Sequence, residues 1–256
     1  MVLPNFKNKY SQDSLFNPKD YLRYQYKREK YDKFRPPAGV ILCYSASLME
    51  YVLNNHKTTK VNRFYGDMYL LKDTNDKVAV IGRFGIGAPV VTTLVEELIA
   101  FGVKQFISIG TAGTLQKELN IGDLVVCEKA IRDEGTSYHY LKPSKYAYAS
   151  KVLTEKIKKF LNTSGQKYIV GTSWTIDAPY RETIAEARQY QNEGVATVEM
   201  EAAALFAVAK YRRVKMGAIF TVSDSLAELQ WSPKFHLKKT KSGLERLYQL
   251  AIEVLQ

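Results

Sequence analysis

The sequence is poor in cysteine, with only Cys43 and Cys127 among its 256 residues. Each lies within an apolar run and the two form no C-x-x-C pair, so a disulfide scaffold, a cysteine-based zinc site and a thioredoxin-type redox motif are excluded. Isolated thiols of this kind are typical of buried cysteines in a reducing compartment. The first residues, MVLPNFKNKYSQDS, contain no apolar segment followed by a small-residue cleavage site, so we expect no secretory signal and a cytoplasmic location.

Long apolar runs are also missing from the chain. The most apolar stretches, such as residues 195–209, are interrupted by charge and fall short of the roughly 18 residues that a membrane-spanning helix requires, so we expect no membrane partner. Disorder is excluded as well, because 46% of the residues are hydrophobic and 11 Phe and 18 Tyr are available for burial. The length suits one large α/β domain or two smaller ones.

The charge balance is strongly basic, with 37 Lys and Arg against 26 Asp and Glu, which gives a net charge of +11. Basic domains often bind nucleic acid, so a nucleic-acid-binding module is one function class to consider. However, the excess is concentrated in residues 1–40 and 142–167, the latter at helix-like spacing beside apolar positions, and no zinc finger, RNP-type motif or recognition-helix pattern accompanies it. We therefore interpret the charge as a solvated surface and expect no nucleic-acid partner.

The N-terminal segment differs in composition from the remainder of the chain. Residues 1–38 are polar, basic and Tyr-rich, and they end in Arg35-Pro36-Pro37, where the second proline disfavours helix at the first. We predict a basic, Tyr-rich arm over residues 1–38, with a short helix over 18–30. A single catalytic domain is predicted over residues 39–256.

In the domain, short runs rich in β-branched residues alternate with segments of helical periodicity. The predicted strands cover residues 40–44, 68–71, 78–83, 105–109, 124–127, 168–171 and 216–222. The predicted helices cover residues 48–55, 90–101, 145–161, 181–193, 199–211 and 240–255. This alternation predicts an α/β fold, a three-layer sandwich with a mixed, mostly parallel central sheet between helices.

Ligands of such sheets bind beyond the carboxyl ends of the strands, so these ends are the first candidates for a site. Two of them are rich in glycine, at residues 85–89 (GIGAP) and 109–114 (IGTAGT), where backbone N–H groups and hydroxyls suit a phosphate or a sugar oxygen. A third reads VSDS at residues 222–225. An acid at the end of a buried strand is partly desolvated, which raises its pKa and fits Asp224 for proton donation near neutral pH.

Two carboxylates open an otherwise apolar helix in the segment VEMEAA, residues 198–203. Acids in a first helical turn are favoured by the helix dipole, which is the purely structural explanation of Glu199 and Glu201. Glu201 precedes a run of Ala, Leu and Phe and is expected to point partly inward, where an unpaired carboxylate is costly. Vicinal sugar hydroxyls would satisfy it.

Taken together, these segments resemble the nucleoside phosphorylase family, which includes hexameric purine nucleoside phosphorylases, uridine phosphorylases and methylthioadenosine/adenosylhomocysteine nucleosidases. The similarity runs in consistent order from about residue 39 to 225. It is carried by residues 109–123 (IGTAGTLQKELNIGD), 130–137 (AIRDEGTS), 198–209 (VEMEAAALFAVA) and 221–225 (TVSDS). The resemblance implies cleavage of a nucleoside N-glycosidic bond with phosphate as co-substrate, no other cofactor and no metal. It also implies a homodimer or a dimer-based hexamer.

The resemblance also implies roles for individual residues at the base and the sugar. Asp224 matches the acid that protonates N7 of a departing purine, and Ser223 matches the neighbour that orients it. Glu201 matches the carboxylate that holds the ribose hydroxyls, with Met200 beneath the sugar and Glu199 alongside. The segment that builds the base pocket in the family supplies three candidates here: Trp174, Tyr180 and Arg181. Uridine phosphorylases read uracil with an arginine in this neighbourhood, but a pyrimidine has no N7, so Asp224 favours a purine.

At the phosphate, Thr111 and Gly110 match the family's glycine-rich loop, and Arg63, or Lys60, matches an arginine donated across a subunit interface. Two arginines that hold phosphate in the family's phosphorylases are missing here. Residues 43–48 read CYSASL in place of a GDPxR loop, and Ser108 stands where the second arginine is expected, three residues before Thr111. Hydroxyls are poor replacements for bidentate arginine contacts to phosphate.

Nucleosidases lack these arginines too and use a glutamate to activate water, a position that Glu50 roughly matches. Phosphorolysis of a purine nucleoside is therefore our first expectation. The alternatives are a uridine-type phosphorylase, a water-using nucleosidase with Glu50 as base and, in another class, a basic nucleic-acid-binding module.

Overall fold

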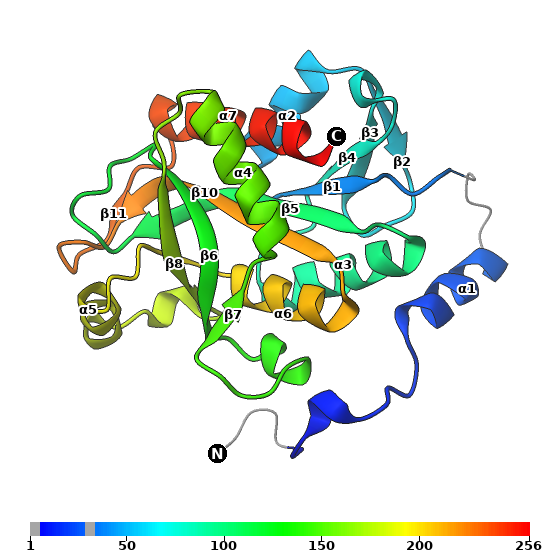
Figure 1. The fold of residues 1–256 in the computed structure, drawn as a ribbon, viewed down its shortest axis with the longest axis horizontal. Coiled ribbons are helices and arrows are strands. Elements are labelled where there is room, and N and C mark those ends of the chain that lie inside the picture. The colour runs from blue at the N-terminus through cyan, green and yellow to red at the C-terminus, as the bar shows by residue number, and fades with distance from the viewer. Residues whose placement is uncertain (1–5, 29–33) are drawn as a thin grey trace.

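The structure, a computed structural model, describes residues 6–28 and 34–256, which contain an 11-stranded sheet (Figure 1). Its spatial order is β11-β10-β6-β8-β9-β5-β1-β4-β3-β2, with β7 paired to β6 and an additional pairing of β10 with β5. The strands are β1 (Gly39–Cys43), β2 (Thr58–Val61), β3 (Asp67–Leu71), β4 (Val78–Gly82), β5 (Gln105–Thr114), β6 (Leu124–Asp133), β7 (Tyr146–Tyr148), β8 (Ile169–Ile176), β9 (Thr197–Glu199), β10 (Lys215–Ser225) and β11 (Ser232–Pro233).

The sheet is mixed, as predicted. Strand β1 runs parallel to β4 and β5, β5 runs parallel to β10, and β6, β8 and β9 form a second parallel group. Two antiparallel pairs, β10 with β6 and β5 with β9, join these groups. The other antiparallel pairs, β10 with β11, β2 with β3, β3 with β4 and β6 with β7, extend the sheet at its margins. The carboxyl ends of β5, β9 and β10 consequently meet in one region.

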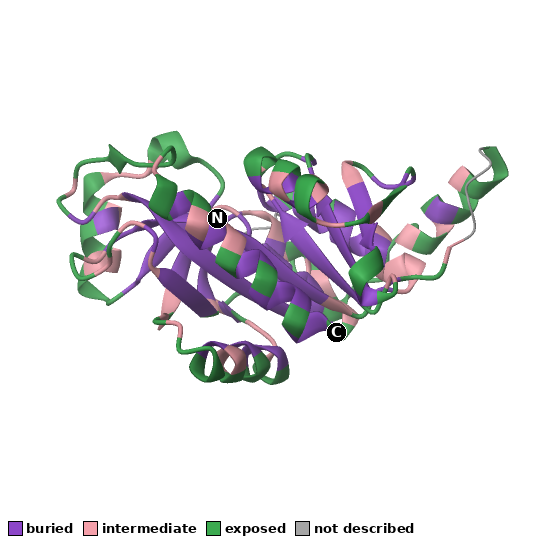
Figure 2. Ribbon diagram, turned by 90° about the horizontal axis from the view of Figure 1, so that it is seen from above, coloured by how far each residue is buried: buried purple, intermediate pink, exposed green. Residues whose placement is uncertain are grey.

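Helices cover both faces of the sheet, which confirms the predicted α/β fold. They are α1 (Pro18–Arg28), α2 (Ala46–Asn55), α3 (Ala88–Phe101), α4 (Lys151–Thr163), α5 (Ile184–Asn192), α6 (Ala202–Arg212) and α7 (Lys238–Leu255). Alternate residues of β1 belong to different cores: Val40 and Leu42 pack in the cluster of α3 and α6, whereas Ile41 and Cys43 pack in the cluster of α2, α4 and α7. Figure 2 shows the strands buried between exposed helix faces.

Several boundaries differ from the sequence prediction, because pairing partners distant in sequence extend the sheet. The strand predicted at 105–109 continues to Thr114, since β10 and β9 pair with its glycine-rich end, which is therefore strand and not a turn. The first residues of the helix predicted over 145–161 form β7 against β6, and α4 begins at Lys151. Glu199, predicted to begin a helix, is the last residue of β9, and α6 begins at Ala202. Arg181 lies in the short 3-10 helix η4 (Pro179–Arg181), and α5 begins at Ile184.

The predicted arm contributes α1, which packs against α3 with Leu22 buried. The helix predicted over 18–30 is present over the described part, residues 18–28, and its last two residues lie outside the described range. The division of the chain at residue 38 stays a prediction. Cys43 and Cys127 are both free and buried, as expected. Among the residues that the structure describes, no helix is long and apolar enough to cross a membrane.

Candidate active site

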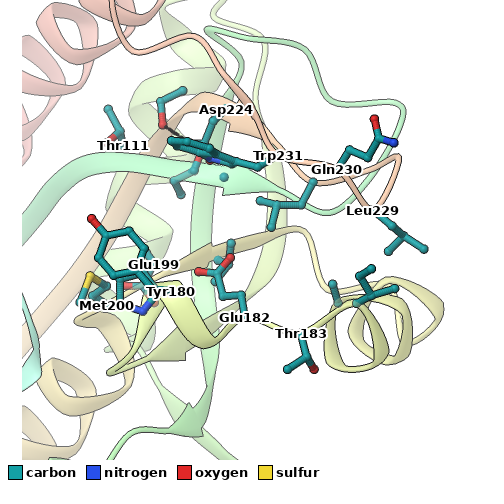
Figure 3. Close-up of a pocket in the computed structure, with 18 of the residues that line it drawn as sticks. Thr111, Tyr180, Glu182, Thr183, Glu199, Met200, Asp224, Leu229, Gln230 and Trp231 are labelled. Atoms are coloured by element: carbon teal, nitrogen blue, oxygen red, sulfur yellow. Dashed lines mark hydrogen bonds between the residues drawn. The ribbon is translucent and has the colours of Figure 1, made fainter.

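A cavity of about 480 Å³ lies where β5, β9 and β10 end, with the chain around η4 and the segment after β10 as its other walls (Figure 3). From the strand ends come Thr111, Gly113, Glu199, Ser223 and Asp224, and Met200 follows β9 directly. This is the position that the α/β topology predicts for a ligand site. Most of the lining is apolar or aromatic, and the polar groups are few, as in small-molecule sites generally.

Asp224 is aimed into this cavity by an irregularity in β10. The register of β10 on β5 shifts between Val222, which pairs with Ala112, and Asp224, which pairs with Gly113, so Ser223 is the extra residue of a β-bulge. Gly113 leaves the room that the carboxyl group needs, because a Cβ at this position would lie 2.9 Å from Asp224 Oδ2. The side chain is nearly buried, with 7% exposed.

Both oxygens of the Asp224 carboxyl group have hydrogen-bond donors. Ser223 Oγ donates to Oδ1 over 2.6 Å, and Trp231 Nε1 donates to Oδ2 over 3.0 Å. The first contact joins the Ser223 hydroxyl directly to the Asp224 carboxyl group. The second comes from an indole that is 65% exposed at the mouth of the cavity, so it can be replaced when a ligand enters.

Glu199 lies at the cavity but its carboxylate is occupied by protein groups. Thr175 Oγ1 and Ser173 Oγ donate to Oε1, and the backbone N–H groups of Glu201 and Ala202 donate to Oε2 over 2.8 and 2.7 Å. Burial raises the pKa of Glu199, while these four donors lower it. The side chain thus fixes the start of α6 and the turn through Met200.

Glu201 is held by the first glycine-rich segment. Its Oε1 accepts the N–H of Gly87 over 2.6 Å, at the start of α3, where Gly87 has a φ of +102°. The glycine-rich segment therefore binds a carboxyl group that belongs to the protein itself. Burial and the nearby charge of Glu199 raise the pKa of Glu201 to about 8. Glu201 does not line the cavity itself; its neighbours Met200 and Glu199 do.

A tyrosine occupies the region where the sequence lacks the two arginines. Tyr44 Oη lies 3.2 Å from Ser108 Oγ, and its ring lies over Gly110, where an added Cβ would be 3.3 Å from it. Burial, followed by the charge of Glu201, raises the pKa of Tyr44 well above its usual value, so its hydroxyl stays neutral. Thr111 lines the cavity, whereas Gly110 is not among its lining residues.

Of the three residues expected at the base, the structure brings only Tyr180 to the cavity, at its fully exposed rim. Trp174 is fully buried, packs on Tyr190 and donates through Nε1 to Asp133 Oδ2. The period of β8 explains this, because Ser173 and Thr175 face Glu199 and the residue between them faces the other way. Arg181 is exposed outside the cavity lining.

Arg63 and Glu50 also lie apart from the cavity lining. Arg63 is 8% exposed, and its guanidinium packs over Tyr26 and Phe101, at 3.9 and 4.7 Å from the ring centres, which ties α1 to α3. Glu50 is exposed on α2. In the part of the chain that the structure describes, no lysine or arginine lines the cavity.

Sequence reasoning missed several residues of the cavity, among them Glu182 and Trp231. Burial, Asp224 and Glu186, in that order, raise the pKa of Glu182 to about 7. The pattern QWSPKF directly after the acidic strand end was an available signal, since Trp231 and Phe235 both line the cavity. Within residues 6–28 and 34–256, no group of three or more His, Cys, Asp and Glu side chains is placed to hold a metal ion.

Comparisons with known proteins agree with this architecture. The chain is 33% identical to guanosine phosphorylase of Halorubrum lacusprofundi over 56% of its own length and 59% of that protein. It is 30% identical to uridine phosphorylase of Thermococcus kodakarensis over 54% of each chain. The match therefore spans less than two thirds of either relative.

Purine nucleoside phosphorylase of Toxoplasma gondii, solved with immucillin-H, superimposes with a TM-score of 0.75 at 20% identity. The superposition covers 86% of this chain and 90% of that one, and it shows a shared fold. The family model described as the phosphorylase superfamily matches residues 40–256, which is most of the chain. This chain belongs to the phosphorylase superfamily.

Proposed function

We propose that this protein cleaves the N-glycosidic bond of a purine nucleoside by phosphorolysis, releasing the free base and ribose 1-phosphate. The observation that carries the proposal is Asp224, a nearly buried acid that a β-bulge aims into the cavity, with Ser223 hydrogen-bonded to it. Family membership and the printed names of the two sequence relatives, a guanosine phosphorylase and a uridine phosphorylase, support phosphorolysis of a nucleoside, and the choice of a purine rests on Asp224.

At the base, Asp224 is the general acid that delivers a proton to N7 of the purine. The electron pair of the C–N bond then moves into the ring system, and the base leaves neutral. Displacement of the Trp231 indole from Oδ2 frees the oxygen that faces N7. A pyrimidine offers no N7 to this acid, which is why a purine is favoured over uridine. Arg181, the residue that pointed to uridine, lies outside the cavity lining.

At the sugar, the oxocarbenium-like transition state carries positive charge on the ribose. Met200 supplies an apolar floor beside the cavity, and the carboxyl groups of Glu199 and Glu201 lie behind it. Glu199 is saturated by four donors, so its role is to position Met200 and Glu201. We assign the contact with the ribose hydroxyls to Glu201, which requires the turn around Met200 to open towards the cavity.

At the phosphate, Thr111 is the hydroxyl that contacts the co-substrate, beside Gly110. An oxygen of phosphate attacks C1′ as the base leaves, which gives ribose 1-phosphate. We propose that the protein acts as a homodimer or a dimer-based hexamer, because a neighbouring subunit would bring cationic charge to a cavity whose described lining has none. A monomer by light scattering would contradict this.

The same absence of cations among the described lining residues favours a second candidate, hydrolysis by water. Glu50 is a poor base for it, since that side chain is exposed on α2 and does not line the cavity. We propose nucleoside and phosphate as the small-molecule partners, without nucleic acid, and a cytoplasmic location, which the two free, buried thiols support. Cell fractionation tests the location.

The experiment that tests the reaction is an assay of base release from inosine, guanosine, adenosine and uridine, with and without phosphate. Phosphorolysis predicts that release depends on phosphate and that ribose 1-phosphate accumulates in equal amount. Equal release without phosphate, with free ribose as product, would establish hydrolysis instead.

A further inference from the structure

The cavity continues beyond the catalytic acid, and the proposed reaction gives this further part no role. Figure 3 shows Leu229 at the opposite end of the cavity from Thr111, with Asp224 between them. The side chains that line this further end come from α5 and from the segment after β10, and all of them are aliphatic: Ile184, Ala187, Leu226 and Leu229. We call these four residues the apolar bay.

The apolar bay is held in place by the surrounding structure. Gln191 of α5 donates through Nε2 to the carbonyl of Ala227 over 2.8 Å, which fastens the segment after β10 to the helix. The N–H of Leu229 donates to the carbonyl of Leu226 over 2.8 Å and closes a turn between the two leucines. Leu229 has a φ of +56°, a left-handed conformation that is unfavourable for a leucine. Backbone strain of this kind is retained mainly at ligand sites, and here it presents a leucine to the cavity.

Two polar side chains beside the apolar bay are already hydrogen-bonded within the protein. The Thr183 hydroxyl donates to Glu186 over 2.7 Å, and the Gln191 amide donates to the carbonyls of Leu115 and Ala227. A water molecule needs two to four polar partners to be held well, so the bay binds water poorly. An apolar group of a ligand gains free energy by displacing such water.

We propose that the apolar bay receives an alkyl substituent at position 6 of the purine, so that the protein prefers nucleosides whose base carries such a group. The inference rests on the proposed function, which places N7 of the base at Asp224. It adds a subsite for a part of the substrate that an unmodified purine nucleoside does not have.

The position of the substituent follows from the neighbours of Asp224. A Cβ at Gly113 would lie 2.9 Å from Asp224 Oδ2 and 2.8 Å from Leu226 Cδ1, so the first leucine of the bay lies beside the acid. In a purine, position 6 shares an edge with N7, and the six-membered ring is the part of the base furthest from the sugar. With the sugar at the end of the cavity near Thr111, a base bound to Asp224 through N7 directs its substituent towards Leu226 and α5.

The first test measures binding of the free bases adenine, N6-methyladenine and N6-propyladenine by calorimetry, without any sugar phosphate, so that no reaction takes place. Burial of a methylene group improves Kd by about fourfold, so affinity should rise along this series. We expect N6-propyladenine to bind wild type at least roughly tenfold more tightly than adenine. Equal Kd values for adenine and N6-propyladenine would overturn the assignment.

The second test locates the alkyl group with Leu229→Gly, which removes one wall of the bay and suits the left-handed backbone at this position. Arg213→Gly is the matched control, because Arg213 has a φ of +57° but is exposed and does not line the cavity. We expect the preference for N6-propyladenine over adenine to fall to about threefold or less in Leu229→Gly and to keep its wild-type value in Arg213→Gly. A preference within about twofold of wild type in Leu229→Gly would overturn the assignment.

A complementary variant, Ala187→Leu, fills the bay from α5, where Ala187 is 4% exposed. N6-Propyladenine should lose its advantage in this variant, whereas adenine should bind within about threefold of wild type, because it does not reach the bay. An unchanged ratio of the two Kd values would show that the alkyl group lies elsewhere. If overpacking prevents Ala187→Leu from folding, Leu229→Gly decides the question alone.

Failure of this assignment and failure of the proposed function give different results. If wild type cleaves purine nucleosides but binds adenine and N6-propyladenine equally, the proposed function stands and the role of the bay is wrong. If the preference for N6-propyladenine depends on Leu229 but no nucleoside is cleaved, the bay is a binding site and the proposed function is wrong. When both hold, kcat/KM for N6-propyladenosine should exceed that for adenosine in wild type and not in Leu229→Gly.

Discussion

Replacing Gly113 with alanine tests whether the missing side chain at this position of β5 determines where the Asp224 carboxyl group lies. The added Cβ would lie 2.9 Å from Asp224 Oδ2 and 2.8 Å from Leu226 Cδ1, whereas ordinary contact begins at 3.4 Å. The carboxyl oxygen must therefore retreat by about 0.5 Å. Since a misplacement of about 1 Å costs on the order of 100-fold in rate, we expect kcat for a purine nucleoside to fall roughly tenfold. Overpacking should cost about 1–3 kcal/mol in unfolding free energy.

The assay is steady-state phosphorolysis together with thermal unfolding of the same preparation. Gly135→Ala is the matched control, because its Cβ would meet Asp177 Oδ2 at 3.7 Å and its φ is −80°. We expect the control to keep both kcat and Tm near wild type. If Gly113→Ala lowers Tm but leaves kcat unchanged, Asp224 does not need this position for the chemistry, and the reasoning is refuted.

Three further predictions concern the stability and optical response of the protein. Arg212→Ala should lower the unfolding free energy by about 3–5 kcal/mol, because it leaves the buried Glu96 carboxylate without the guanidinium that binds it at 2.6 and 2.9 Å. Arg23→Ala, which breaks an exposed pair, should cost less than about 1 kcal/mol. Equal Tm values for the two variants would contradict this prediction. The pKa of Glu201 is raised from 4.5 to about 8 in the folded protein. The contribution of this protonated side chain to the unfolding free energy is therefore complete below pH 4.5 and is lost as the pH rises through 8. Tm of wild type should fall more than that of Glu201→Gln over that range, and parallel curves would refute it. Binding of a nucleoside should change the tryptophan emission of wild type but not of Trp231→Phe, because the other tryptophan is fully buried; an equal response in both would place the base elsewhere.

Those parts of the site that lie on strands were predictable from the sequence. Thr111, Ser223 and Asp224 follow or end apolar runs, and parallel strands bring such ends to one edge of a sheet. The sequence also showed that acids precede α6. It did not show that Glu201 binds Gly87, because that contact joins residues more than one hundred positions apart.

The residues that were missed or misplaced depend on tertiary packing. Glu182 and Trp231 lie in the connections after β8 and β10. The direction of a side chain there depends on tertiary neighbours that a local sequence pattern does not predict. Trp174 was expected at the base, but one step along β8 moves a side chain to the opposite face. Arg63 was expected at the phosphate, and the aromatic residues Tyr26 and Phe101 hold it in the core instead.

The most direct test of the central claim is the activity of Asp224→Asn on a purine nucleoside and on uridine, measured in one preparation whose Tm matches wild type. Asparagine keeps the shape of the side chain but has no proton to give to N7. The account predicts that kcat for the purine nucleoside falls on the order of 100-fold or more, while any activity on uridine changes far less. Equal loss on both substrates, or no loss on the purine, would contradict it.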